Sequence, residues 1–158
     1  KVIQNQINQN QNYNMAHYAE LGVDNVVKRV LFIDNIKCMT NGGIEKEEIG
    51  AAYLETHHGG TWIKCSYNTM ENNHLQGGTP FRANYPSKGW IYNSANDIFY
   101  PPRDVDYKGK LMISWVLNTT TGNWTPPIPL PSDADTVSYN WDETLYQSDN
   151  TKGWITNN

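Results

Sequence analysis

Apolar and polar residues alternate over the first part of the chain in a pattern that predicts a β-hairpin. Residues 16–21 and 26–33 are the two strands, and Asp24–Asn25 lies in the turn between them. In the second strand the alternation places Val27 on the same face as Leu31, and it leaves apolar side chains on both faces. We therefore expect both faces of this sheet to be at least partly covered.

A helical period follows at residues 44–58. Apolar residues recur there at three- and four-residue spacing, acidic residues occupy the first turn, and Gly59–Gly60 ends the segment. The acidic side chains suit the positive end of the helix dipole, and the two histidines of the last turn suit its negative end. Residues 61–68 then alternate as a strand does, whereas 69–88, which contain paired glycines and two prolines, are predicted to form a long loop.

One short pattern recurs three times in the second half of the chain: an aromatic residue, any residue, an apolar or aromatic residue, then Asn or Asp. The copies begin at Trp90, Trp115 and Tyr139, so they lie 25 and 24 residues apart. In the first two copies a second aromatic residue, Phe99 or Trp124, is followed closely by a pair of prolines. Because proline has no amide N–H to donate, a strand stops there.

Turn-forming residues lie between the two aromatic residues of each copy, so each unit is predicted to be a β-hairpin bounded by prolines. The third copy is longer and extends to Trp154. Hairpins of this size are only marginally stable alone, so they must pack on each other, on the upstream domain or on a partner. The predicted fold is mostly β (α+β): an antiparallel sheet with one helix, followed by tandem aromatic β-hairpins with Pro-Pro linkers.

The composition divides the chain into three parts. Residues 1–14 are rich in Gln and Asn and too poor in apolar residues to fold alone. We expect them to form an extended arm that lies along a neighbouring subunit, with Ile3 and Ile7 on one face of the strand. Residues 15–85 are predicted to form the α+β domain, and residues 86–158 the hairpin repeats.

The charge and hydropathy of the chain argue against two classes of partner. The formal net charge is −4 at pH 7, and lysines and arginines nowhere gather beyond Lys28–Arg29. We therefore expect no nucleic acid as a partner. The longest uninterrupted apolar run is Val30–Ile33, which is far too short to cross a bilayer. Membrane insertion is not expected either.

The residue types that usually carry catalysis or bind metals form no recognised motif. Adjacent His57 and His58 would point about 100° apart on a helix, and no Cys-x-x-Cys or His-x-x-x-His spacing exists. Cys38 and Cys65 are typical of two reduced, buried thiols, and a single disulfide is the alternative. We expect no enzymatic activity and no cofactor. A hydrolytic carboxylate pair could come only from acids in turn-like segments, for which exposure to solvent is the ordinary explanation: Asp104, Asp106, Asp133, Asp135, Asp142 and Glu143.

Two interpretations of the repeated aromatic residues remain open. Rings on strands can form a surface on which sugar rings stack, while Asn and Asp in the turns supply hydrogen bonds. Alternatively, the rings form the core of the hairpins or a contact with a neighbouring subunit, because small hairpins have little else to bury. The candidate residues are Trp90, Tyr92, Phe99, Trp115, Trp124, Tyr139 and Trp141.

Several stretches resemble a family of small proteins encoded by marine tailed bacteriophages, especially those that infect cyanobacteria. The stretches are 15–21 (MAHYAEL), 25–35, 44–53, 59–68 and the hairpin at 115–131. Proteins of that family are generally regarded as virion structural or tail-associated proteins, and they have no established catalytic residues. The arm before Met15 and the long third hairpin depart from the family pattern.

The resemblance implies a non-catalytic structural component of a virion, in the tail, a fibre or the capsid surface. Its expected partners are other phage structural proteins, with which it would form a homo-oligomer or part of a larger assembly. The alternative function is an adhesion module whose aromatic hairpins contact a host cell-surface glycan.

Overall fold

The computed structural model describes residues 15–157, so the predicted arm with Ile3 and Ile7 lies outside the described part of the chain. The fold is mostly β, with antiparallel sheets and one main helix, as the sequence predicts. The first half contains β1 (Met15–Leu21), η1 (Val23–Asn25), β2 (Val27–Asp34), η2 (Asn35–Cys38), α2 (Glu47–His58) and β3 (Thr61–Cys65). The rest contains β4 (Thr69–Met70), β5 (Asn73–His74), β6 (Ile91–Asn93), β7 (Ile98–Tyr100), β8 (Val116–Asn118), β9 (Asn123–Thr125), β10 (Tyr139–Trp141), α3 (Glu143–Ser148) and β11 (Trp154–Thr156).

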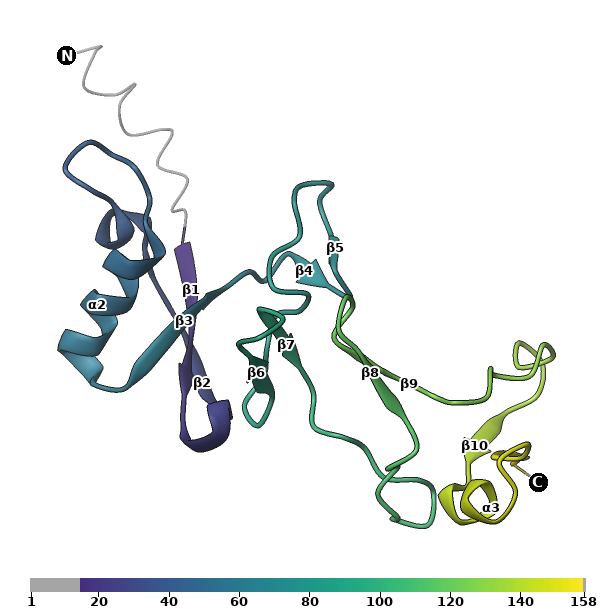
Figure 1. Cartoon of the computed structure of the whole chain (residues 1–158). Coiled ribbons are helices and arrows are strands. Elements are labelled where there is room, and N and C mark those ends of the chain that lie inside the picture. Colours follow the sequence, from purple (N-terminus) through teal and green to yellow (C-terminus); the bar gives the residue numbers. More distant parts are fainter. Residues whose placement is uncertain (1–14, 158) are drawn as a thin grey trace.

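Strands β1, β2 and β3 form one antiparallel sheet in the order β2-β1-β3, and helix α2 packs on one of its faces (Figure 1). In the core between the helix and the sheet, Leu54 of α2 and Tyr18 of β1 are fully buried, and Trp62 of β3 is nearly so. Gly50 packs against the hydroxyl end of Tyr18 and against Cys38, and a Cβ atom at this position would overlap both side chains. The absence of a side chain at Gly50 therefore sets how closely the helix approaches the sheet.

The helix begins at Glu47, three residues after the predicted start at residue 44. The reason lies in the backbone pairing just before it, because Met39 and Glu45 form an isolated antiparallel bridge and Thr40 N donates to Ile44 O at 2.8 Å. This pairing holds residues 44 and 45 in an extended conformation. The end of the helix at His58, before Gly59, agrees with the prediction.

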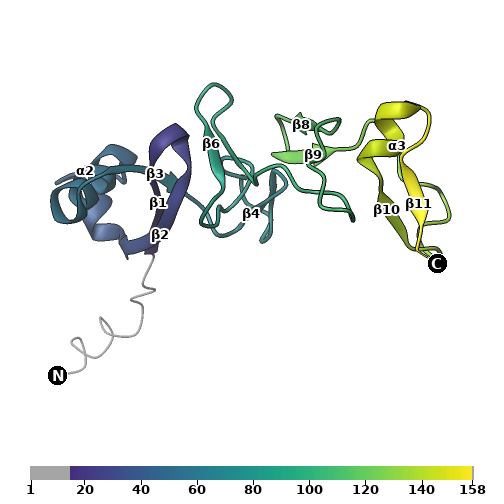
Figure 2. The same cartoon turned by 90° about the horizontal axis from the view of Figure 1, so that it is seen from below.

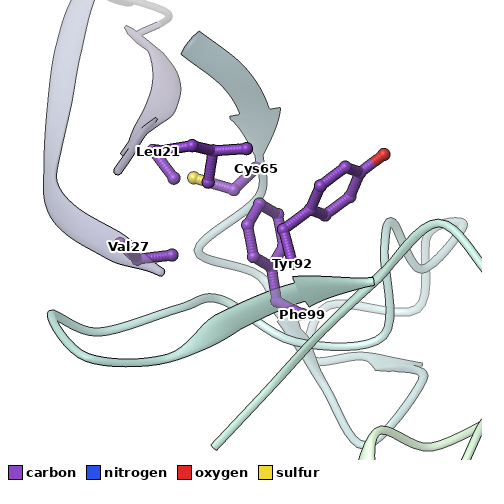
Figure 3. Packing of buried hydrophobic residues seen from close by; sticks show 6 residues of the cluster. Leu21, Val27, Cys65, Tyr92 and Phe99 are labelled. Carbon is purple, nitrogen blue, oxygen red and sulfur yellow. The ribbon is translucent and has the colours of Figure 1, made fainter. Parts of the chain in front are cut away.

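The second face of the sheet is covered by the hairpin β6–β7 (Figure 3). Leu21, Val27 and Cys65 of the sheet pack there against Tyr92 and Phe99 of the hairpin. The backbones also meet, since the Val27 amide donates to the Trp90 carbonyl at 2.7 Å. The hydrophobic core therefore continues across residue 85, where the sequence suggests a domain boundary.

A β-bulge changes the faces predicted for the second strand. Glu20 pairs with Arg29, but the next residue, Leu21, pairs with Val27, so Lys28 has no opposite residue. The extra residue moves Val27 to the face covered by the β6–β7 hairpin, whereas Leu31 stays beneath helix α2. The prediction that Val27 and Leu31 share a face is therefore wrong.

The remaining strands form four two-stranded antiparallel sheets: β4–β5, β6–β7, β8–β9 and β10–β11. Hairpin β6–β7 lies next to the first sheet, β4–β5 and β8–β9 lie beyond it, and the carboxyl terminus with β10–β11 lies at the far end (Figures 1 and 2). The predicted loop at 69–88 contains the short hairpin β4–β5, whose turn residues Glu71 and Asn72 have φ of 51° and 60°. Helix α3 lies between β10 and β11 and accounts for the length of the third aromatic segment.

Residues 15–157 include no helix with the length and apolar character that a bilayer crossing requires.

Candidate functional site

The aromatic residues of the first copy belong to the core against the sheet. Phe99 is fully buried, Tyr92 is nearly so, and half-buried Trp90 packs against the same cluster. The rings of Tyr92 and Phe99 have centroids 5.1 Å apart, and the two residues are direct cross-strand partners. Burial and a hydrogen bond from the Tyr92 hydroxyl to Asp97 raise the pKa of Tyr92 to about 12.

The second and third copies share a cluster of three tryptophans. The centroids of Trp141 and Trp154 are 5.2 Å apart, and Trp115 lies 5.9 Å from Trp141 and 6.1 Å from Trp154. All three contacts are edge-to-face, the arrangement that ring quadrupoles favour. Gly153 packs directly on the Trp141 ring and leaves no room for a Cβ atom. The cluster joins the segment before β8 to the hairpin β10–β11.

The two remaining candidate aromatic residues lie apart from these groups. Trp124 donates from Nε1 to the Pro101 carbonyl at 3.0 Å, and the Arg103 guanidinium covers its ring at 3.9 Å from the centroid. The Tyr139 hydroxyl donates to Asp133 at 2.9 Å. Five of the seven candidates thus belong to two aromatic groups and two lie apart, and within the described residues the seven form no continuous exposed row.

Three carboxylates among the acids considered for catalysis are buried, although the sequence suggests solvated turns. Glu143 is fully buried, and its two oxygens accept from Ser114 N at 3.1 Å, Ser114 Oγ at 2.7 Å and Trp141 Nε1 at 2.9 Å. Asp106 accepts from the backbone of Lys108, Lys110 and Glu143 at 2.8–3.0 Å. These carboxylates therefore hold the segment before β8 against α3.

The environment keeps these carboxylates ionised. Burial alone would raise the pKa values of Asp106 and Glu143, but the hydrogen bonds donated to each carboxylate outweigh burial and lower both values. The pKa of Asp142 is lowered chiefly by Lys108, whose Nζ lies 2.8 Å from Asp142 Oδ2. A general acid needs a carboxyl group that stays protonated near neutral pH. The arrangement thus does not favour a general acid among these three residues.

Two polar side chains that no sequence motif marks connect strands, turns and the helix that lie far apart in the chain. Asn84 is 3% exposed, and its Nδ2 donates to Phe99 O at 3.0 Å and Thr121 O at 2.9 Å, while its Oδ1 accepts from Glu71 N at 2.8 Å. Asn84 therefore joins three hairpins through one side chain. Arg82 acts in the same way between α2, β3 and the β6–β7 turn, with bonds of 2.6–2.7 Å to Glu47, Lys64 O and Asp97.

Both cysteines are buried free thiols, as predicted, and they lie in different core clusters. Cys38 packs beneath helix α2, whereas Cys65 belongs to the cluster on the opposite face. Burial raises the pKa of Cys65 to about 12 and also raises that of Cys38. Among residues 15–157, no three His, Cys, Asp or Glu side chains are grouped so that they could hold a metal ion.

A cavity of about 550 Å³ opens at the amino-terminal end of β1. Strands β1 and β3 pair as far as His17 and Cys65, and beyond this point the chain after β3 leaves the sheet. The cavity lies between the start of β1 and the segment that follows β3. Its walls include His17, Asn35, Glu45, Lys64, Tyr67 and Asn68.

Comparison of the chain with protein-family models, with curated proteins and with solved structures finds no match.

Proposed function

We propose that this protein is a non-catalytic structural component of a tailed-phage virion, part of the tail, a fibre or the capsid surface, which acts through contacts with other virion subunits. The proposal rests on the aromatic side chains, which pack against other residues of the same chain. Phe99 and Trp141 are at most 4% exposed, and Trp115 makes edge-to-face contacts with two other tryptophans. Rings engaged in this way stabilise an extended module and offer little area to a sugar.

We propose further that residues 86–158 are tandem copies of one aromatic hairpin joined by Pro-Pro linkers. Tyr92 pairs with Phe99 in β6–β7, and Leu117 pairs with Trp124 at the equivalent place in β8–β9. Both turns use the same bonds, because the side-chain oxygens of Asn93 and Asn118 each accept from the amides two and three residues later. Equal register and equal turn chemistry support a common unit.

An exposed apolar surface between the two hairpins supports a role in subunit contacts. Val105 and Leu111 face each other across an isolated antiparallel bridge and are 48% and 47% exposed. Ile113 and Val116, which follow in the same segment, are 58% and 65% exposed. Large apolar side chains that gather at the surface of one segment are typical of protein–protein contacts.

The virion proposal is tested by locating the chain in purified phage particles. Quantitative mass spectrometry should find it at a fixed ratio to the major capsid protein, and antibody-coupled gold should label one part of the particle. A chain abundant in infected cells but absent from washed particles would contradict the proposal. The glycan alternative is tested separately with Trp115→Ala on a glycan array.

Contact through residues 1–14 is a separate part of the proposal. We propose that Ile3 and Ile7 dock on a neighbouring subunit, because a segment so poor in apolar residues gains order most readily by pairing with another strand edge. Deletion of residues 1–14 should then lower the oligomer mass measured by light scattering. An unchanged mass would contradict the role of the arm and leave the virion proposal intact.

A further inference from the structure

The cavity at the amino-terminal end of β1 is lined by both aromatic and polar side chains. His17 and Tyr67 both line it, and the centroids of their rings lie 5.0 Å apart. Tyr67 is 55% exposed. Its ring therefore retains area that a ligand in the cavity can cover.

The polar side of the cavity carries little net charge. Glu45 and Lys64, which both line it, form an ion pair with each other. Burial lowers the pKa of His17, so its ring is neutral at pH 7, and its Nδ1 lies 3.0 Å from the Tyr85 hydroxyl. A cavity lined by paired charges and neutral rings favours an uncharged ligand over an anion or a cation.

One wall residue also has an unused acceptor. Asn35 Oδ1 is buried and has no hydrogen-bond partner among the described residues, while its Nδ2 makes only a long contact of 3.4 Å with Glu45. Buried acceptors without a partner are uncommon, because each costs the desolvation of a polar group. A rotation of the Asn35 side chain toward the cavity would let a ligand O–H or N–H satisfy this buried oxygen.

We propose that this cavity binds an uncharged sugar ring, such as the terminal pyranose of a glycan. A pyranose has one apolar C–H face that can lie on Tyr67, and hydroxyl groups that can donate to Asn35 Oδ1 and bond to Asn68 and the Glu45–Lys64 pair. A cavity of about 550 Å³ also lies within the size range of small-ligand sites. The site is distinct from the aromatic hairpins and does not depend on their role.

Saturation-transfer NMR on the full chain tests the proposal with glucose, galactose, mannose and N-acetylglucosamine as probes. At least one sugar should receive saturation and shift the His17 ring resonances. Tyr67→Ala and Asn35→Ala should each weaken binding about tenfold, the usual effect of losing one dominant contact. Tyr107→Ala is the matched control, because Tyr107 is another half-exposed tyrosine but does not line the cavity.

The outcomes separate the alternatives. Circular dichroism first confirms that each variant is folded. Equal binding by wild type and Tyr67→Ala, or the absence of any sugar signal at His17, would overturn the proposal. A synthetic peptide of residues 1–14 is included as a competitor. If that peptide shifts His17 and no sugar does, the cavity is a peptide site and the sugar proposal fails.

Discussion

Asn84 and Thr121 lie 37 residues apart, yet the Asn84 side-chain amide donates to the Thr121 carbonyl at 2.9 Å. The contact is tight, because Gly122 packs so closely on Asn84 and on the Phe99 carbonyl that a Cβ atom would overlap both. This pair attaches the β8–β9 turn to the part of the molecule that contains the main core. The geometry of Asn84 thus fixes how the second hairpin follows the first.

Asn84→Asp is expected to destabilise the protein by about 3 kcal/mol, because the carboxylate keeps the shape of the side chain but cannot donate to two buried carbonyls. Urea unfolding followed by fluorescence measures the change. Asn96→Asp is the control, because Asn96 is exposed and its side chain makes no hydrogen bond within the described residues. Equal midpoints for the two variants would contradict the role of Asn84.

Gly153→Ala is expected to lower the free energy of unfolding by about 1–3 kcal/mol, because the added methyl group would overlap the Trp141 ring. The change should also alter tryptophan fluorescence, since Trp141 is in contact with Trp115 and Trp154. Gly42→Ala is the matched control, since the nearest atom to its new Cβ is Thr40 Oγ1 at 3.7 Å, an ordinary contact. A Gly153→Ala protein with unchanged stability and native fluorescence would contradict the close packing of Gly153 on Trp141.

The stability of the carboxyl-terminal half is expected to fall in acid. The pKa values of Asp106, Asp142 and Glu143 are lowered in the folded protein, so their contribution is present above the unfolded pKa values and is lost as the pH falls through the folded ones. The urea midpoint should therefore drop between about pH 7 and about pH 3. Glu143→Gln should have a lower midpoint at neutral pH and a smaller drop. An equal drop in both proteins would contradict the role of Glu143.

The two thiols are expected to react slowly in the native protein. Burial raises the pKa of Cys65 to about 12, so very little thiolate forms at neutral pH, and Cys38 is fully buried. Reaction with a chromogenic disulfide should be about a hundredfold slower in buffer than in denaturant, because it requires local opening. Two fast thiols in the native protein would contradict the packing of β3 and η2.

The helix and strands whose apolar residues recur at a regular spacing could be predicted from the sequence. The helix ends at His58 where the glycine pair indicates, and the two strands of the first hairpin form where the alternation predicts them, although the bulge changes the faces of the second strand. The bulge at Lys28 has no such signal, because it depends on how Leu21 pairs across the sheet. Periodicity also missed helix α3, since six residues are too few to show a helical repeat.

The residues that join the hairpins could not be recognised from composition. Asn84 and Arg82 stand in a segment of prolines and polar residues, where an asparagine is ordinarily a turn residue. Their partners lie 13 to 37 positions away, so no local pattern marks them. Asp106 and Glu143 illustrate the same difficulty, because only the folded chain brings the Glu143 amide to the Asp106 carboxylate. Whether a polar side chain is buried depends on the folded structure, so the local sequence does not reveal it.

Each of the hairpins β4–β5, β6–β7, β8–β9 and β10–β11 pairs strands that are close neighbours along the chain. Closing such short loops costs little entropy, so every hairpin can form as soon as its own residues have left the ribosome. The chain can therefore acquire its structure in the order of synthesis, and β6–β7 can pack on the first sheet once that sheet has formed. Duplication of one hairpin would lengthen such an array, and with it the molecule, without any change in the amino-terminal sheet.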